Sequence, residues 1–315
     1  MEKKLISFCI PCYRSEKTIG IVIDEIIEMM GKRSEEYDYE IINVIDGSPD
    51  NVYAVLKNIA KGNEKIKVIN LAKNFGQAGA RMATLRYAKG DFVVCMDDDA
   101  QCPMQELWNL FKPMEEGKDV SIARYPKKKQ SAFKNLGSKF NNKMVHTLMD
   151  VPKEFEMSNF FIMRRYLVDE ILEYKNPYPY LIGLINRATH NIGYVVMEER
   201  ERAAGTTGYT FKKLISLWMN GFTAFSVIPL RISSFIGVIC AFIGFVFGLV
   251  TIIRKLINPM VGAGWSSTIA IILFVGGLIM LMLGMIGEYL GRIYISLNKS
   301  PQYVVRETVN VDEIK

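Results

Sequence analysis

Short apolar runs alternate with amphipathic stretches along the first hundred residues of the chain. Turn-forming residues bound each apolar run, and the stretch after it places apolar residues three or four positions apart, so strands and helices are predicted to alternate. The predicted strands are 5–10, 40–45, 67–71 and 92–96, and the predicted helices are 15–30, 52–60 and 76–89. This order predicts an α/β fold with a largely parallel sheet, in which ligands bind at the carboxyl ends of the strands.

The pattern is less regular after residue 100. It predicts a strand at 160–163, a helix at 166–172, a strand at 193–196 and an amphipathic helix at 211–225. Residues 120–149 contain seven Lys or Arg and no Asp or Glu, with apolar residues between the charges. This composition predicts a basic amphipathic helix that binds a membrane interface. The alternative is a solvated surface helix.

Two long apolar stretches, 232–253 and 267–287, follow the predicted α/β domain. They have 22 and 21 residues without Asp, Glu, Lys or Arg. About 20 apolar residues are enough for a helix to cross the hydrocarbon core of a bilayer. The sequence therefore predicts a C-terminal hairpin of two transmembrane helices.

The Lys and Arg residues near these stretches predict how the hairpin is oriented. Six flank its outer ends and two lie in its connecting loop: Lys212, Lys213, Arg231, Arg292, Lys299 and Arg306 against Arg254 and Lys255. Because positive charges stay on the cytoplasmic side, both termini are predicted to be cytoplasmic, and no cleavable signal is expected at the N-terminus. The expected layout in the cell membrane is a cytoplasmic domain at 1–208, a juxtamembrane helix at 209–230, the transmembrane helices within 231–291, and a cytoplasmic tail at 292–315.

Composition excludes two other classes of function. The net charge of +6 is modest, and no nucleic-acid-binding motif accompanies it, so no nucleic acid partner is expected. The five cysteines are an odd number, and four lie in the predicted cytoplasmic part, where thiols stay free. Cys9 and Cys12 have the spacing of a zinc or redox pair, but a zinc site needs four ligands and the chain has only two histidines.

Acidic residues follow two of the predicted strands. Asp97, Asp98 and Asp99 come directly after the strand at 92–96, and Asp46 follows the strand at 40–45. In an extended segment Asp97 and Asp99 share a face. Mg²⁺ is usually held by one or two carboxylates together with substrate phosphates. The sequence therefore predicts a site for a metal ion and a phosphorylated ligand at this edge of the sheet.

Several motifs occur in a fixed order with this acidic cluster. Because of these motifs, the chain resembles family 2 glycosyltransferases, which have a GT-A, Rossmann-like nucleotide-sugar-binding fold. It is most similar to the polyprenyl-phosphate sugar transferases, a group with dolichol-phosphate mannose synthases and bactoprenol glucosyltransferases, from residue 6 to about 305. The motifs are Ile10-Pro11-Cys12-Tyr13, Asp46-Gly47-Ser48, Asn74-Phe75-Gly76-Gln77, Ala88-Lys89-Gly90-Asp91, Asp97-x-Asp99-x-Gln101, Arg202-x-x-Gly205-x-Thr207-x-Tyr209, Phe225-Ser226, Pro229-Leu230-Arg231 and residues 287–294.

The resemblance implies roles for residues in these motifs. Contacts to the nucleotide sugar are implied for Pro11, Tyr13, Asp46, Asp97 and Asp98, with Glu16 as a substitute for the usual acidic residue of the first loop. A Mg²⁺ or Mn²⁺ site is implied at Asp97, Asp99 and Gln101, and the catalytic residues are Asp97, Asp99 and Arg202. The acceptor phosphate is expected to contact Arg124, Arg202 and Thr207, and the basic stretch adds Lys134.

The chain departs from its relatives at three points. Ile45 precedes Asp46 where relatives often have a second acidic residue, and Arg14-Ser15 replaces the usual Asn-Glu. Asn159-Phe160-Phe161 replaces Gly-Phe-Arg, so the arginine near the acceptor side is absent.

The function predicted from the sequence is inverting transfer of one sugar from a UDP-sugar to undecaprenyl phosphate, which makes a lipid-linked donor for cell-envelope glycans. Two alternatives stay open: a family 2 transferase with another lipid or glycan acceptor, and a membrane-tethered sugar-nucleotide sensor or flippase scaffold. A flippase partner and a homo-oligomer are also open. Gly244 and Gly248, and Gly287 and Gly291, have the spacing of close helix contacts.

Overall fold

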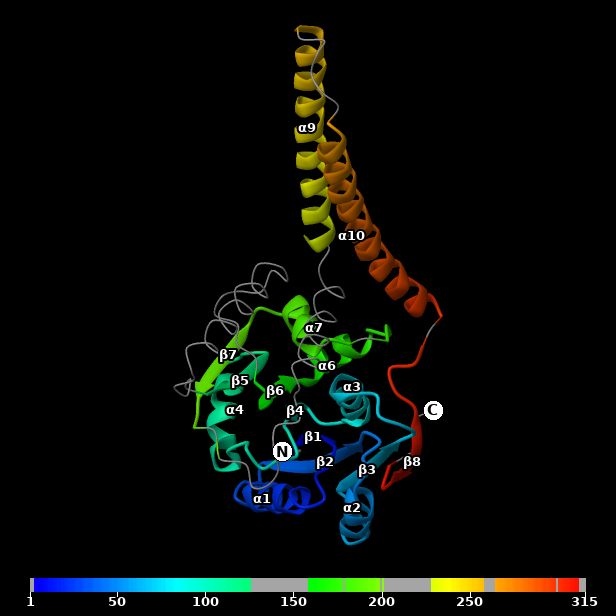
Figure 1. Ribbon diagram of the computed structural model, residues 1–315. Helices are drawn as coiled ribbons and strands as arrows, with labels where there is room; N and C mark the ends of the chain where they lie inside the picture. Colours follow the sequence, from blue (N-terminus) through cyan, green and yellow to red (C-terminus); the bar gives the residue numbers. More distant parts are fainter. Residues whose placement is uncertain are drawn as a thin grey trace. The chain divides into compact units, whose positions relative to one another are not determined.

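The computed structural model describes residues 3–125, 158–177, 179–198, 200, 228–257, 264–298 and 300–311, and its ribbon is shown in Figure 1. The chain divides into two compact units. The first contains residues 1–214 together with 299–315, and the second contains residues 215–298. The basic helix predicted at 120–149 is wrong at its start, because Val120–Arg124 is a strand. The rest of that helix from residue 126, the motif at 202–209 and the predicted helix at 211–225 lie outside the described residues.

The first unit alternates strands and helices as the sequence pattern predicts. Its strands are β1 (Lys4–Cys12), β2 (Tyr37–Ile45), β3 (Ile66–Leu71), β4 (Phe92–Cys95), β5 (Val120–Arg124), β6 (Phe161–Arg164), β7 (Ile192–Val196) and β8 (Val305–Val309). Its helices are α1 (Ile19–Gly31), α2 (Val52–Lys61), α3 (Gln77–Tyr87), the 3-10 turn η1 (Met104–Glu106), α4 (Leu107–Glu115), α6 (Arg165–Leu172) and α7 (Leu181–Ala188). The sequence pattern predicts no helix at α4, which carries Pro113 in its last turn.

All eight strands form one sheet, in the order β7-β5-β6-β4-β1-β2-β3-β8. The four central strands β4, β1, β2 and β3 are parallel to one another, as the alternating pattern predicts. Strand β6 is antiparallel to both β4 and β5, and β8 is antiparallel to β3. The sheet is therefore parallel at its centre and mixed toward both edges.

Helices cover both faces of the sheet (Figure 1). Helix α1 buries Ile19, Val22, Ile23 and Ile26, whose three- and four-residue spacing forms one apolar stripe. These residues share a single hydrophobic core with buried residues of α2 and α4 and with alternate residues of β1. Helices α3 and α6 contact each other on the opposite face. Helices packed on both faces of the sheet therefore hold in place the strand ends that carry the acidic residues.

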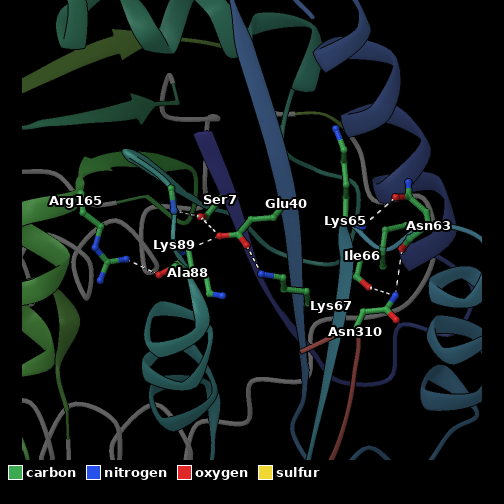
Figure 2. Close-up of polar contacts among 11 residues, drawn as sticks. Ser7, Glu40, Asn63, Lys65, Ile66, Lys67, Ala88, Lys89, Arg165 and Asn310 are labelled. Carbon is green, nitrogen blue, oxygen red and sulfur yellow. Dashed lines mark hydrogen bonds and ion pairs between the residues drawn. The ribbon is translucent and has the colours of Figure 1, made fainter. Parts of the chain in front are cut away.

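Glu40 anchors a buried polar network that explains the Ala88-Lys89-Gly90-Asp91 motif (Figure 2). Its carboxylate accepts hydrogen bonds from Ser7 Oγ at 2.5 Å and from the Lys89 backbone N–H at 2.6 Å, and it pairs with Lys67. Gly90 N–H donates to Ser7 Oγ at 2.7 Å, and a Cβ at Gly90 would lie 2.7 Å from the Ser7 nitrogen. The glycine is therefore required by close backbone contact, and the motif sets where β4 begins.

The C-terminal residues return to the sheet after the apolar helices. Strand β8 pairs with β3, and the Asn310 side chain donates to the carbonyl of Ala60 at 2.7 Å. It also donates to the carbonyl of Ile66 at 3.0 Å (Figure 2). Within the predicted tail at 292–315, helix α10 continues to Leu297 and residues 305–309 form an edge strand. The run Val-Arg-Glu-Thr-Val is short and has polar residues at its three central positions, so it gives little signal for a strand unless its partner strand is known.

The second unit is a helical hairpin of α9 (Ile228–Ile257) and α10 (Trp265–Leu297), and the two predicted helices are confirmed. The two helices contact each other: a Cβ at Gly237 would lie 3.0 Å from Met282 Cε. Within α10, Phe274–Ile295 is long and apolar enough to cross a membrane, whereas the apolar segment found in α9, Phe235–Val250, is shorter.

Candidate active site

The carboxyl ends of β1, β2 and β4 lie side by side, which confirms that the acidic residues after β2 and β4 belong to one edge of the sheet. Asp46 N–H donates to Cys12 O at 3.0 Å, and Met96 N–H donates to Cys9 O at 3.2 Å. Asp46 and Asp97 both contact the segment at 74–81, which contains the start of α3. The two acidic positions therefore lie on either side of one helix N-terminus.

Asp46 is buried and holds the loop that precedes α3. Its two carboxylate oxygens accept the backbone N–H groups of Phe75 at 2.6 Å and Gly76 at 2.8 Å, and its carbonyl accepts from Asn74 Nδ2 at 2.9 Å. Burial raises the pKa of Asp46, while the two backbone hydrogen bonds oppose that rise. Hydrogen bonds thus join the motif Asp46-Gly47 to the motif Asn74-Phe75-Gly76. A nucleotide contact by Asp46 stays a prediction.

Asp97 accepts hydrogen bonds from three side chains. Arg81 Nη2 lies 2.9 Å and Gln77 Nε2 3.2 Å from its Oδ1, and Asn159 Nδ2 lies 2.5 Å from its Oδ2. Gln77 and Arg81 are one turn apart on α3, so their side chains leave the same face of the helix. Asn159 comes from the segment just before β6, the antiparallel neighbour of β4.

Asp98 points away from its neighbours toward the loop that follows β1. Its Oδ2 accepts Tyr13 N–H at 2.9 Å, and its carbonyl accepts from Thr18 Oγ1 at 2.6 Å. Burial raises the pKa of Asp98 to about 6, the hydrogen bond from Tyr13 N–H opposes the rise, and the nearby charge of Asp97 adds to it. The side chains of Asp97 and Asp98 therefore hold different parts of the site, as an extended segment requires.

Asp99 and Gln101 complete the acidic segment. Gln101 N–H donates to Asp99 Oδ1 at 3.2 Å across Ala100, which has φ +59. Gln101 Nε2 donates to the carbonyl of Arg200 at 3.2 Å, and Arg200 pairs with both carboxylate oxygens of Glu25 at 2.7 and 2.8 Å. These bonds tie the acidic segment to α1.

The predicted metal ligands Asp97, Asp99 and Gln101 offer two carboxylates and an amide oxygen, a donor set that suits a hard divalent cation with substrate phosphates. No cluster of three or more Asp, Glu, His or Cys side chains suited to a metal occurs in the part of the chain that the structure describes. Asp97 is already bound by Gln77, Arg81 and Asn159. The residues fit a cation whose remaining ligands come from a bound phosphate group.

The loop after β1 carries the other predicted nucleotide contacts. Pro11 belongs to β1, which continues through it to Cys12. The Tyr13 side chain is 45% exposed, and the guanidinium of Arg14 lies 5.4 Å from its ring centre. Glu16 Oε2 accepts Asn51 N–H at 3.0 Å at the start of α2. The Tyr13 ring is thus exposed on this loop, whereas Glu16 links the loop after β1 to the loop after β2.

Arg124 lies at the end of β5, with its guanidinium 4.5 Å from the centre of the Tyr194 ring. The other predicted acceptor contacts, Lys134, Arg202 and Thr207, lie outside the described residues. Cys9, Cys12, Cys95 and Cys102 are buried free thiols, so the expectation of free thiols is confirmed for these four.

The sequence analysis missed the three hydrogen-bond donors to Asp97. These are Gln77, whose motif was noted without this role, Arg81 and Asn159. The four-residue spacing of Gln77 and Arg81 after Gly76 is a signal that both lie on one helical face. Which carboxylate that face meets depends on how α3 packs on the sheet.

Comparison with known proteins identifies the class to which this fold and site belong. The profile of Glycosyl transferase family 2 matches residues 7–172, and the profile of the GtrB C-terminal hairpin matches residues 228–293. A solved mycobacterial protein has a similar fold, with a TM-score of 0.50 and 20% identity over 68% of this chain and 71% of that chain.

Two curated relatives match almost end to end. The undecaprenyl-phosphate 4-deoxy-4-formamido-L-arabinose transferase of Proteus mirabilis is 31% identical over 97% of this chain and 94% of its own length. The SfII prophage-derived bactoprenol glucosyl transferase of Shigella flexneri is 29% identical over 96% of this chain and 98% of its own length. The chain belongs to glycosyltransferase family 2, has the GT-A fold, and carries a GtrB-type hairpin.

Proposed function

We propose that this protein transfers one sugar from a UDP-sugar to a polyprenyl phosphate, undecaprenyl phosphate in bacteria, with inversion at the sugar carbon. The observation that carries the proposal is the match to relatives named for bactoprenol and undecaprenyl phosphate, which extends through the catalytic unit and the hairpin alike. Those relatives are named for different sugars, so their names support the lipid acceptor and leave the sugar open.

The nucleotide of the donor is proposed to bind where the loops after β1 and β2 meet. Tyr13 offers an exposed ring for the base, and its backbone is held by Asp98. Pro11, Glu16 and Asp46 shape the same loops through the contacts described above. A site built on strand ends and rigid loops favours precise placement of the reacting groups, which is a main source of rate acceleration in transferases that lack covalent chemistry.

The donor diphosphate is proposed to lie beside Asp97 and Asp99. A Mg²⁺ or Mn²⁺ ion held by Asp97, Asp99 and Gln101 would neutralise the charge that develops on the leaving diphosphate. Arg81 adds a positive charge on the Asp97 side of this cluster. The charge balance of the site therefore suits a diphosphate leaving group.

The acceptor phosphate is proposed to attack the sugar carbon directly. A phosphate monoester with a second pKa of about 6 is mostly dianionic at neutral pH, so the nucleophile needs no strong general base. Arg124 at the end of β5 is a candidate contact for this phosphate, and Lys134, Arg202 and Thr207 are proposed to join it. One direct displacement inverts the configuration at the sugar carbon.

The hairpin is proposed to insert in the membrane that holds the lipid acceptor, with both termini in the cytoplasm. In the hairpin taken alone, large apolar side chains are exposed on both helices, for example Phe242 at 68% and Met280 at 71%. Exposed apolar surface of this extent is unfavourable in water and favourable in hydrocarbon. The distribution of Lys and Arg supports the orientation.

The experiment is a product analysis. Membranes that contain the full-length protein are incubated with undecaprenyl phosphate and a panel of UDP- and GDP-sugars, and the lipid products are identified by mass. We expect one UDP-sugar to give a lipid product in which a hexose is linked to the lipid phosphate, and mild acid should release the hexose from it. Asp99→Asn protein should lose this product, whereas Asp24→Asn, which changes an exposed Asp of α1, should keep it.

Two results would contradict the proposal. A product that mild acid does not cleave would indicate another acceptor within the same family. Nucleotide binding without release of UDP over time, with every donor and acceptor tested, would indicate a sensor or scaffold and not a transferase.

A further inference from the structure

Arg81 is a buried cation at the active site that none of the sequence motifs explains. The residue is only 9% exposed, and its Nη2 lies 2.9 Å from Asp97 Oδ1. Its Nε is buried and has no hydrogen-bond partner within the described chain. A buried guanidinium is costly unless its charge and its donors are satisfied. Arg81 is therefore paired in charge but incompletely hydrogen-bonded.

Asp97 is held firmly by its partners. Gln77 and Arg81 reach one oxygen from the same face of α3, and Asn159 reaches the other from the segment before β6. Helix α3 is itself fixed at its start by the bonds from Asp46 to the backbone of Phe75 and Gly76. The position of the Asp97 carboxylate is thus set by rigid elements on both sides.

The pairing also changes the charge of the acidic segment. Three consecutive carboxylates, Asp97 to Asp99, would attract a divalent cation strongly, but Arg81 supplies one opposing charge within direct contact of Asp97. At such distances opposite charges attract each other strongly, so Arg81 competes with a cation for Asp97. Phe161 is fully buried and carries no charge, whereas Arg81 of α3 is a cation in direct contact with Asp97.

We propose that Arg81 is a positioning residue that makes binding of the divalent cation depend on the nucleotide diphosphate. By occupying Asp97, Arg81 weakens the cation site of the free protein. A diphosphate brings oxygen ligands for the cation and negative charge that offsets Arg81, so cation and nucleotide bind cooperatively. The inference rests on the donor site proposed above, although its first measurement needs neither nucleotide nor turnover.

The test is direct titration of Mn²⁺ by electron paramagnetic resonance on the purified full-length protein, without nucleotide and with UDP. Wild-type protein should bind Mn²⁺ weakly alone and about tenfold more tightly, or better, with UDP. Arg81→Met should bind Mn²⁺ alone about tenfold more tightly than wild type, because Asp97 loses its competing charge. Its gain from UDP should shrink.

Two further variants separate charge from structure. Arg81→Lys keeps the charge and should keep weak Mn²⁺ binding with strong coupling to UDP. Arg86→Met removes an exposed arginine from the same helix and should behave as wild type. If Arg81→Met does not fold, as judged by circular dichroism, Arg81→Gln takes its place, with the same expected increase in Mn²⁺ affinity.

Unchanged or weaker Mn²⁺ binding in folded Arg81→Met or Arg81→Gln protein would overturn the inference, and so would an equal change in Arg86→Met. Failure of the proposed function looks different. If UDP has no effect on any variant, the assigned donor is wrong and the coupling of cation to UDP fails with it, whereas tighter Mn²⁺ binding after removal of Arg81 still supports the competition of Arg81 for Asp97.

Discussion

A Cβ at Gly79 would lie 2.7 Å from the carbonyl oxygen of Gln302, so helix α3 and the segment before β8 touch through a position that only glycine can occupy without a shift. The two residues are separated by most of the sequence. The same segment is bound by Ala72 N–H to Val304 O at 2.8 Å, and Gln302 Nε2 donates to the carbonyls of Tyr174 and Asn176. The segment that leads into the C-terminal strand therefore packs against the helix that carries Gln77 and Arg81.

Replacement of Gly79 should loosen this contact. In Gly79→Ala protein the backbone of the C-terminal segment must shift, because the clash is with a carbonyl oxygen and not with a flexible side chain. We expect a loss of about 1–3 kcal/mol in the free energy of unfolding and faster hydrogen exchange in β8. Gly20→Ala on α1 is the control: nothing lies within 4 Å of its Cβ, and alanine should stabilise the helix slightly. Equal exchange rates in β8 of both variants would contradict the packing argument.

Asp46→Asn should damage the donor site through the backbone. Asparagine keeps one oxygen acceptor, so its amide group would face either Phe75 N–H or Gly76 N–H, donor against donor. A lost bond of this kind to a buried group costs roughly 1–3 kcal/mol. We expect Asp46→Asn protein to have a lower melting temperature and a higher KM for the nucleotide sugar than wild type. Asp24→Asn protein, measured in the same way, is the control and should match wild type. A raised KM without any loss of stability would instead support a direct nucleotide contact by Asp46.

Asp98 should make stability depend on pH in protein free of metal and nucleotide. Burial raises its pKa to about 6 in the folded state, so between the ordinary value of about 4 and pH 6 the folded protein binds the extra proton. The free energy of unfolding from this group therefore falls as pH rises through that window. Asp98→Asn, which cannot ionise, should gain roughly 2–3 kcal/mol relative to wild type between pH 4 and pH 7. Denaturant midpoints at both pH values check this, and parallel curves for the two proteins would refute it.

Cys102 should resist alkylation although it adjoins the acidic cluster. Burial raises its pKa to about 12, and the nearby charge of Asp97 contributes, so the reactive thiolate is scarce at pH 8. Mass spectrometry after iodoacetamide treatment should show little modification of Cys102 in the folded protein and full modification in denaturant. Rapid modification of the native protein would show that the loop after β4 is more open than its packing indicates.

Local patterns in the sequence determined much of the architecture. Apolar runs and helical spacing predict β1 to β4 with α1 to α3, because the central strands are buried on both faces and the helices pack apolar side chains on the sheet. They also predict the helical hairpin, because long runs without charge have few other stable structures. The positions after β2 and β4 are predicted as the site because parallel strands align their carboxyl ends.

Tertiary structure decided which partners the acidic residues have. The sequence by itself placed Asp46 and Asp97 at strand ends, but only the packing of α3 and β6 showed that Asp46 holds a loop and that Asp97 is bound by Gln77, Arg81 and Asn159. The same is true of β8, a short and mostly polar run whose role as a strand depends on pairing with the edge of β3. Local periodicity records which face of an element is buried, whereas the partner across that face depends on contacts between residues far apart in the chain.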